Sequence, residues 1–445
     1  MGLTAREAAF KALGAFRRDG RLPDKDFGLP RDGAETSARE IGLATQLFNG
    51  VLQNLAYCDY VISHYSAIDL KKMHPHVLDI LRISAYQIIF LTKIPRSAAV
   101  NEGVSLSRKH SNPQAAGFVN AVLRKVADGA TLDSLPEVAY GDRRRYLAVK
   151  YSHPEWLVEE FCERLGADAA EMLLMANNST GTPLAAQVNT LSAEAGTVLS
   201  SLAADGVEAY GHEWLESCVM IRRPGPIERL EAFSKGHIYI QDAASYLAVA
   251  AAGPKPGDYV IDACAAPGGK SFAAAIMMND TGRVLACDIS APRLGLIKEA
   301  AARLGIGCIT ISESDALEHY AQLTEKADIV MADVPCSGFG VIRKKPDIRY
   351  KAQHEIAGLP ELQRGILSNL SAYVKPGGRL LYSTCTVLKR ENEDVVESFL
   401  GGHAEFSPEG FCIPGIGDVP EGMLTLWPHI HGTDGFFICK MKRTS

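Results

Sequence analysis

Two cysteines and a glycine-rich loop are the residues of this 445-residue chain best suited to chemistry. Cys336 lies in the motif Asp333-Val334-Pro335-Cys336-Ser337-Gly338, and Cys385 lies in Ser383-Thr384-Cys385-Thr386. A thiolate attacks electron-poor carbon, and a second thiol can assist proton transfer on the same substrate. Two thiols acting on one pair of substrate atoms are what the methylation of carbon 5 of a pyrimidine requires.

The glycine-rich loop leaves a predicted strand near Asp262 and enters a predicted helix near Lys270. Its glycines let the backbone approach a ligand, and the helix start presents free N–H groups to a carboxylate. Asp288 ends the next strand, where an acid can accept both ribose hydroxyls, and Asp315 follows the third strand, placed to meet an adenine amino group. Each acid alone is equally consistent with a turn. Together with the glycine turn, the two acids predict S-adenosylmethionine as the ligand.

Composition is that of an ordinary globular protein, with 47% apolar and 22% charged residues. The sequence has neither an apolar run long enough for a membrane span nor a signal peptide, so we expect a cytoplasmic protein. Its 10 cysteines form no Cys-x-x-Cys pair. A disulfide framework and a metal site are therefore not expected, and we expect a monomer.

Charge is distributed unevenly along the chain. The formal net charge is −6, yet residues 1–130 have a net charge of +5 and the remainder has −11. Basic residues cluster at 143–145, 222–223 and 343–345. Such clusters are more often solvated faces, and phosphate contact becomes credible where a cluster lies next to the catalytic motifs.

The elements that must position these residues fall into three regions. Residues 1–130 predict an all-helical bundle, because apolar residues recur at helical spacing, for example from Val77 to Leu91. Residues 131–146 lack periodicity and predict a linker. Residues 147–240 mix predicted helices after Pro154 and over 193–202 with strands at 186–189, 218–221 and 237–240, which indicates a small α+β module.

Residues 241–445 alternate strands and helices, which is typical of a doubly wound, mostly parallel α/β sheet. Helices are predicted over 293–304 and 359–374. Strands are predicted at 259–261, 284–287, 308–311, 328–331, 379–382 and 436–439. Ligands bind such sheets beyond the carboxyl ends of the strands, where the two cysteine motifs and the acids all fall. The fourth and fifth strands are expected to be neighbours, so Cys336 and Cys385 should converge.

These motifs support a resemblance to known families. The segments 262–270, 333–347 and Thr384-Cys385 resemble the RNA cytosine-5 methyltransferases. Upstream, 81–87, 101–104 and 118–123 resemble the transcription antitermination factor NusB. A NusB-like domain joined to this catalytic domain is the layout of the bacterial small-subunit ribosomal RNA methyltransferase B group, also called Sun or Fmu. Together the resemblances cover nearly the whole chain and imply a Rossmann-like methyltransferase domain that acts on 16S ribosomal RNA.

The resemblance also implies residue roles. The cofactor pocket would be lined by Cys264, Ala265, Ala266, Pro267, Gly268, Gly269, Lys270, Asp288, Asp315 and Asp333. Cys385 would attack carbon 6 of a cytosine, Cys336 would promote release, and Asp333 would stabilise the base. A nearby cation such as Lys270 would lower the pKa of the nucleophile. The helical domain and the small module would bind RNA, although the helical domain is almost equally consistent with protein contacts. RNA contacts are further expected at Arg343, Lys344, Lys345 and Arg349. One departure is that residues 186–189 lack the basic residue expected before Val188-Asn189.

Alternative functions remain open at this point. Transfer RNA is a possible substrate, because the preference for ribosomal RNA rests on the NusB-like fusion. A ribosome assembly or antitermination factor without catalysis is disfavoured by the intact Cys336, Cys385 and Lys270. A DNA cytosine methyltransferase would use the Pro-Cys cysteine as nucleophile. Methylation of exocyclic amines is disfavoured by the motif at 333–336.

Overall fold

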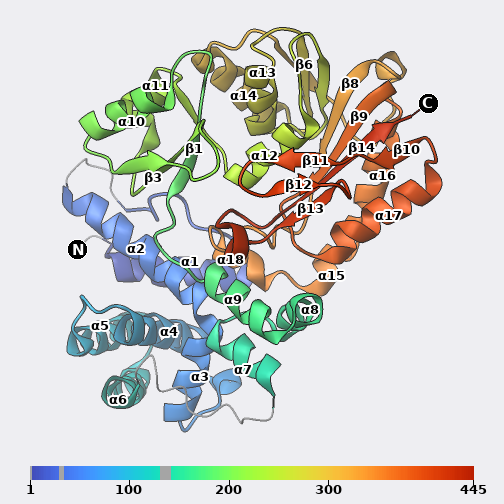
Figure 1. The fold of residues 1–445 in the computed structure, drawn as a ribbon. Coiled ribbons are helices and arrows are strands. Elements are labelled where there is room, and N and C mark those ends of the chain that lie inside the picture. The colour runs from blue at the N-terminus through green and yellow to red at the C-terminus, as the bar shows by residue number, and fades with distance from the viewer. Residues whose placement is uncertain (1–2, 30–34, 131–141, 445) are drawn as a thin grey trace. The chain divides into compact units, whose positions relative to one another are not determined.

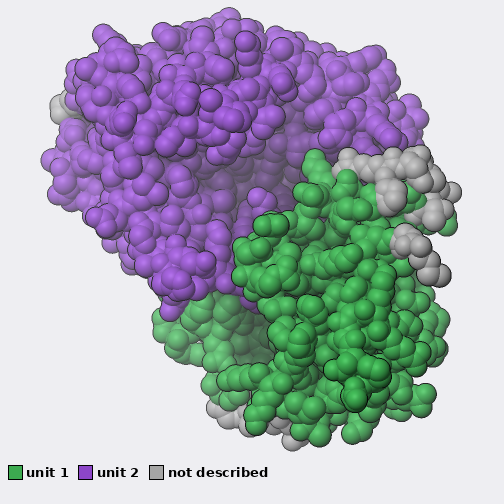
Figure 2. Space-filling model, turned by 180° about the vertical axis from the view of Figure 1, so that it is seen from behind, with its two compact units in different colours: residues 1–178 green, residues 179–445 purple. Residues whose placement is uncertain are grey.

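The computed structural model describes residues 3–29, 35–130 and 142–444. The chain forms two compact units, residues 1–178 and residues 179–445, which are coloured green and purple in Figure 2. No helix within the described residues is long and apolar enough to cross a lipid bilayer.

The described part of the first unit is helical. Helix α4 is its centre and contacts α1, α2, α3, α5 and α6. Its side chains Val77, Ile80, Leu81 and Ala85 are buried, as the apolar spacing predicts. The predicted helical bundle is confirmed. Its helices are α1 (Ala5–Asp19), α2 (Glu35–Gln53), α3 (Leu55–Tyr65), α4 (Pro75–Phe90), α5 (Arg96–His110) and α6 (Pro113–Gly129).

Three further helices complete the first unit: α7 (Arg143–Lys150), α8 (Glu155–Leu165) and α9 (Ala167–Asn177). Residues 131–141 of the predicted linker lie outside the described residues, and its last residues already belong to α7. Helix α7 contacts α3, and Leu147, Phe161 and Leu174 are buried. The compact units therefore divide at residue 178, whereas the sequence pattern placed the start of the small module at residue 147.

The second unit begins with a small α+β module, as predicted. Its antiparallel sheet has the order β2-β3-β1-β4, and α10 and α11 pack on it. Strand β4 leads through Gln241 and Asp242 directly into helix α12 of the next domain. The elements are β1 (Leu184–Val188), α10 (Ala195–Ala204), β2 (Ala209–Gly211), β3 (Cys218–Ile221), α11 (Glu231–Ser234) and β4 (Ile238–Ile240).

An eight-stranded sheet forms the core of the remaining residues (Figure 1). Strands β7-β6-β5-β8-β9 are parallel neighbours in that order, and β14 adds to β9 antiparallel, with β10 and β13 beside it. This confirms the predicted mostly parallel sheet. The strands are β5 (Tyr259–Asp262), β6 (Arg283–Asp288), β7 (Ile309–Glu313), β8 (Ala327–Asp333), β9 (Val374–Thr384), β10 (Phe406–Pro408), β13 (Met423–Leu426) and β14 (Phe436–Arg443).

Helices cover both faces of this sheet. Successive strand residues point to opposite faces, so Val260 packs in one apolar core and Ile261 in the other. Residues of α12, α13 and α14 complete the first core, and residues of α16 and α17 complete the second. The helices are α12 (Ala243–Ala252), α13 (Gly269–Met277), α14 (Ala291–Leu304), α15 (Gln353–Ile356), α16 (Leu359–Ser371), α17 (Glu393–Gly402) and α18 (Pro428–His431). A small hairpin, β11 (Phe411–Ile413) with β12 (Gly417–Val419), lies before β13.

Candidate active site

The two cysteine motifs meet at the carboxyl edge of the large sheet. Asp333 pairs with Ser383 in the parallel ladder of β8 and β9, so the chain leaves both strands at the same level. Cys336 and Cys385 are free thiols whose Sγ atoms lie 3.1 Å apart. One substrate ring can therefore be reached by both.

The two thiols differ in their electrostatic surroundings. The hydrogen bond with Cys336 and the charge of Lys270 lower the pKa of Cys385 below its ordinary value. Burial and the charge of Asp333 work against this shift. The hydrogen bond with Cys385, burial and the charge of Glu391 raise the pKa of Cys336 well above its ordinary value. Because the thiolate is the nucleophilic form, these surroundings favour attack by Cys385 while Cys336 stays protonated.

Lys270 forms a polar network beside the thiols. Its Nζ atom donates to Asp333 Oδ2 at 2.7 Å and to Ser245 Oγ at 2.7 Å. Ser383 donates to the other carboxylate oxygen of Asp333 at 2.9 Å. The ammonium also lies 5.1 Å from the centre of the Phe436 ring. Asp333 is therefore held in one orientation at the end of β8.

A cavity of about 450 Å³ opens beside the two thiols. This volume lies within the range of ordinary small-molecule sites. Its lining contains a residue from the carboxyl end of each of the parallel strands β5, β6, β7, β8 and β9, which are respectively Cys264, Asp288, Asp315, Asp333 and Cys385. The predicted convergence at this edge of the sheet is therefore what the structure shows.

The loop between β5 and α13 forms one wall of this cavity. Gly268 has φ +108°, and a Cβ atom there would lie 2.5 Å from the Phe272 ring, so a larger residue does not fit. The Ala266 N–H donates to Asp288 Oδ2 at 3.1 Å. Arg293 of α14 donates to the Ala266 carbonyl. The loop and the end of β6 are therefore fixed to each other.

The predicted loop residues have different positions relative to the cavity. Cys264 and Ala266 line it directly. Lys270 is connected to the lining through Asp333. Outside the lining, the remaining loop residues shape the turn from β5 into α13; they are Ala265, Pro267, Gly268 and Gly269.

Among the lining residues that sequence reasoning missed are Ile289, Leu317 and Arg293. Ile289 is 67% exposed and Leu317 is 49% exposed, so both apolar side chains are accessible to a ligand in the cavity. Each follows one of the predicted acids, Asp288 or Asp315, by one or two positions. An apolar residue next to a strand-end acid was the available signal, because a flat base needs apolar contacts beside polar ones.

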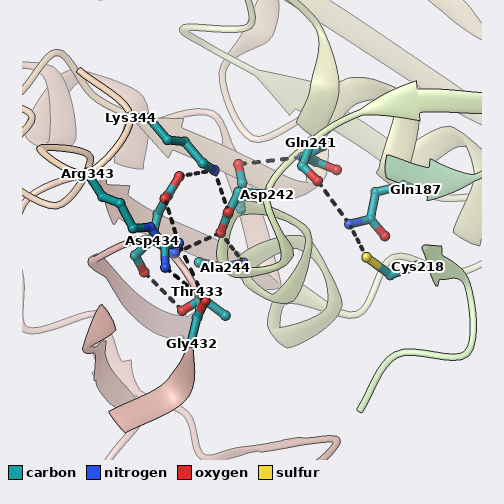
Figure 3. Close-up of polar contacts among 11 residues, drawn as sticks. Gln187, Cys218, Gln241, Asp242, Ala244, Arg343, Lys344, Gly432, Thr433 and Asp434 are labelled. Carbon is teal, nitrogen blue, oxygen red and sulfur yellow. Dashed lines mark hydrogen bonds and ion pairs between the residues drawn. The ribbon is translucent and has the colours of Figure 1, made fainter. Parts of the chain in front are cut away.

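Two of the basic residues predicted to contact RNA are bound to carboxylates (Figure 3). Lys344 Nζ donates to Asp242 Oδ2 at 2.6 Å and to Asp434 Oδ2 at 2.7 Å. Arg343 lies 3.5 Å from Asp434 Oδ1, and its side chain is 9% exposed. Burial and the charge of Asp242 raise the pKa of Asp434 to about 6. This cluster joins the loop after Cys336 to the starts of α12 and β14.

The other two residues of the basic segment differ from each other. Arg349 is fully buried in the short helix Pro346–Tyr350, whereas Lys345 is exposed. The sequence pattern treated all four cations as one RNA-contacting group. Arg343 and Arg349 have internal positions because the loop that follows Cys336 folds back onto the domain, whereas Lys344 stays exposed but is held by two carboxylates.

Known protein families match three parts of the chain. The model of the 16S rRNA methyltransferase RsmB/F matches residues 249–442. The NusB family matches residues 3–128, and the ferredoxin-like domain of RsmF/B-like methyltransferases matches residues 153–228. The probable ribosomal RNA small subunit methyltransferase B of Bacillus subtilis is 38% identical over 421 residues, covering 92% of this chain and 92% of that protein. The chain belongs to the RsmB/F methyltransferase family.

Two further proteins match nearly the whole length of this chain. The probable methyltransferase B of Synechocystis is 30% identical over 452 residues, covering 99% of this chain and 100% of that protein. The solved structure of PH0851 is 27% identical, with a TM-score of 0.77, and covers 99% of this chain and 98% of that one. The predicted family, the NusB-like region and the use of S-adenosylmethionine are therefore confirmed. Within the described residues, no group of three or more His, Cys, Asp or Glu side chains is arranged to hold a metal ion.

Proposed function

We propose that this methyltransferase transfers a methyl group to carbon 5 of a cytosine in 16S ribosomal RNA, through a covalent bond between Cys385 and the base. The observation that supports this most strongly is the pair of free thiols, 3.1 Å apart, at the edge of the cavity. Carbon 5 of cytosine is a poor nucleophile until a thiolate adds to carbon 6. Methylation of an exocyclic amine would need neither thiol.

The lining of the cavity fits S-adenosylmethionine. Asp288 would accept the ribose hydroxyls, and Asp315 would accept from the adenine amino group. Ile289 and Leu317 offer apolar contacts to the adenine ring, and the first turn of α13, into which the loop leads, offers helix N–H groups to the carboxylate. When bound, the cofactor supplies an electrophilic methyl group.

The thiols and Asp333 perform the proposed steps. The Cys385 thiolate adds to carbon 6, which makes the ring electrons available at carbon 5. Asp333 accepts a hydrogen bond from the amino group of the base and orients it, and the positive charge of Lys270 beside Asp333 stabilises the negative charge that develops at ring nitrogen 3. After carbon 5 has taken the methyl group, Cys336 as thiolate removes the carbon 5 proton. The C–H electron pair restores the double bond, the C–S bond breaks, and Cys385 leaves as thiolate.

The change of role at Cys336 follows from its surroundings. The hydrogen bond with Cys385 is the largest influence that raises the pKa of Cys336. Once the Cys385 sulfur is bonded to carbon, it no longer has a negative charge. Cys336 can then lose its proton to solvent and act as the base in the release step.

The substrate assignment rests on the relatives, which are named small-subunit ribosomal RNA methyltransferases. The target base must be unstacked to expose both ring faces, so a single-stranded or flipped nucleotide is expected. The helical domain (1–130) and the small module (147–240) would add RNA contacts, as would the exposed Lys345 of the basic segment. We expect a cytoplasmic monomer that acts without a metal. Transfer RNA is the alternative substrate.

A denaturing gel tests the covalent mechanism. Wild type, Cys336→Ala and Cys385→Ala are incubated with S-adenosylmethionine and unmodified 16S ribosomal RNA. Cys336→Ala is expected to accumulate a protein–RNA adduct because release is blocked, and mapping the adduct identifies the base. Transfer RNA in a parallel incubation tests the alternative substrate.

The possible outcomes separate the alternatives. Adduct with Cys385→Ala alone would reverse the roles of the two thiols. Methylation without adduct in any variant would contradict the covalent intermediate. Cofactor binding without methylation or adduct would favour a non-catalytic RNA-binding assembly factor.

A further inference from the structure

The peptide that contains Cys336 is held from both sides by two buried side chains. Gln363 of α16 donates to the Pro335 carbonyl at 2.9 Å. On the other side, the Ser337 N–H donates to Glu391 Oε2 at 2.8 Å. Gln363 also donates to Glu391 Oε2 at 3.0 Å, which joins the two. Both side chains are fully buried. Cys336 is therefore fixed between two anchored neighbours.

The same segment also supports the chain around Cys385. Glu391 lies six residues after Cys385, and its carbonyl accepts from the Tyr382 hydroxyl at 2.6 Å. Ser337 Oγ donates to Thr386 Oγ1 at 2.9 Å. The positions of both thiols relative to each other therefore depend on one hydrogen-bonded assembly.

Burial of the Glu391 carboxylate lowers the stability of the fold. Its Oε1 atom has no hydrogen-bond partner among the described residues. A buried carboxylate oxygen without a partner lowers stability, so its presence needs an explanation. An apolar side chain of the same size would fill this space without leaving a buried oxygen unpaired. The contacts of Oε2 with the Cys336 peptide supply that explanation.

We propose that Glu391 and Gln363 are positioning residues that hold the Cys336 thiol against Cys385 and thereby permit release of the methylated base. The proposal rests on the proposed function, because a release step exists only if Cys385 bonds to the base. Cys336 lies in a loop without helix or strand hydrogen bonds of its own. Without the two anchors, its sulfur would lose the fixed 3.1 Å separation.

Two disruptive variants and one conservative variant test this role. Glu391→Met and Gln363→Leu keep the side-chain size but remove the hydrogen bonds to Ser337 and Pro335. Glu391→Gln keeps an oxygen at the position of Oε2, so it retains the contacts without the charge. Glu409→Met is the control for the carboxylate, because Glu409 pairs with Arg379 and Lys440, away from the thiols.

Gln187→Leu is the control for the amide. Gln187 is fully buried, and it contacts Cys218 and the Gln241 carbonyl in the small module (Figure 3). Each folded variant is incubated with 16S ribosomal RNA and methyl-labelled S-adenosylmethionine. The covalent adduct, the released methylated RNA and the cofactor affinity are then measured.

The disruptive variants are expected to resemble Cys336→Ala. Labelled adduct should accumulate, release should slow about ten- to hundredfold, and cofactor affinity should stay unchanged. Glu391→Gln should release product nearly as fast as wild type. The two controls should lose stability at most and form no excess adduct. A general structural defect would instead lower adduct and product together.

Failure of the proposal differs from failure of the proposed function. If Cys336→Ala itself forms no adduct while wild type methylates, the covalent mechanism is wrong. If Cys336→Ala accumulates adduct but folded Gln363→Leu and Glu391→Met do not, the positioning role is wrong. Should Glu391→Met not fold, Gln363→Leu decides: adduct accumulation there supports the positioning role, and release at the wild-type rate refutes it. Slow release in Glu391→Gln as well would show that the Glu391 charge contributes beyond position.

Discussion

The Nζ atom of Lys270 lies 2.7 Å from a carboxylate oxygen of Asp333, in a site where both side chains are largely shielded from water. Lys270 lies in the first turn of the helix that follows the cofactor loop, and Asp333 ends the strand before the Pro-Cys motif. The contact therefore joins the predicted cofactor site to the predicted catalytic site. A change at Lys270 should affect both.

Lys270→Met is expected to slow methyl transfer about a hundredfold or more, because Asp333 loses its charged partner and its fixed orientation. The positive charge of Lys270 also lowers the pKa of Cys385, second to the hydrogen bond with Cys336. The variant should therefore have a higher Cys385 pKa. The measurement is the rate of iodoacetamide modification of Cys385 against pH, followed by mass spectrometry.

The matched control is Lys375→Met. Lys375 pairs with Asp328 at the opposite edge of the sheet and is 46% exposed. Its removal should leave the alkylation profile of Cys385 unchanged. An unchanged profile in Lys270→Met as well would refute the electrostatic role of Lys270.

Asp288→Ala should weaken the binding of S-adenosylmethionine. Asp288 lines the cavity and also accepts from the Ala266 N–H of the loop. Loss of charged hydrogen bonds of this kind costs about 1.5–3 kcal/mol, which corresponds to about 10- to 150-fold in Kd. Isothermal titration calorimetry measures the affinity directly.

Asp258→Ala is the control for this measurement, because Asp258 precedes β5 at the amino edge of the sheet. Its carboxylate accepts a hydrogen bond from the Lys255 N–H there. Cofactor affinity should be unaffected there. Equal affinities of folded Asp288→Ala and wild type would show that the ribose is bound elsewhere.

Asp262 should make stability depend on pH. Burial raises the pKa of Asp262 to about 6, against the hydrogen bond from Ser271. Because the folded state holds this proton more tightly than the unfolded state, the free energy of unfolding falls as pH rises from about 4 to 6. Asp262→Asn removes this dependence. Relative to that variant, wild type should lose at most about 3 kcal/mol over this range, measured by urea unfolding.

Asp280→Asn provides a control of opposite sign. Burial opposes ionisation at Asp280, but the N–H groups of Gly307 and Cys308 lower its pKa overall. Its contribution to stability is therefore lost as pH falls, not as it rises. If Asp262→Asn and wild type kept a constant difference in stability across pH 4 to 6, the raised pKa of Asp262 would be disproved.

Much of the fold was predictable from periodicity. The alternation of strands and helices after residue 241 predicted the parallel sheet, and the strand at 328–331 corresponds to the longer β8. The predicted helix 359–374 was too long, because Val374 already begins β9. Its apolar side chain continues the helical spacing and gives no sign of the change. The short strands β10 to β13 were missed, since segments of three or four residues show no periodicity.

The sequence by itself determined the kinds of groups available: two thiols, three strand-end acids, a glycine turn and a lysine at the start of the following helix. It also determined the edge of the sheet at which they lie, because parallel strands present their carboxyl ends together. The tertiary structure decided which groups touch. It selected Asp333 as the partner of Lys270, bound Lys344 to Asp242 and Asp434, and placed Glu391 beside Ser337. These pairings follow from burial and distance between segments far apart in the chain, and residue order does not encode them locally.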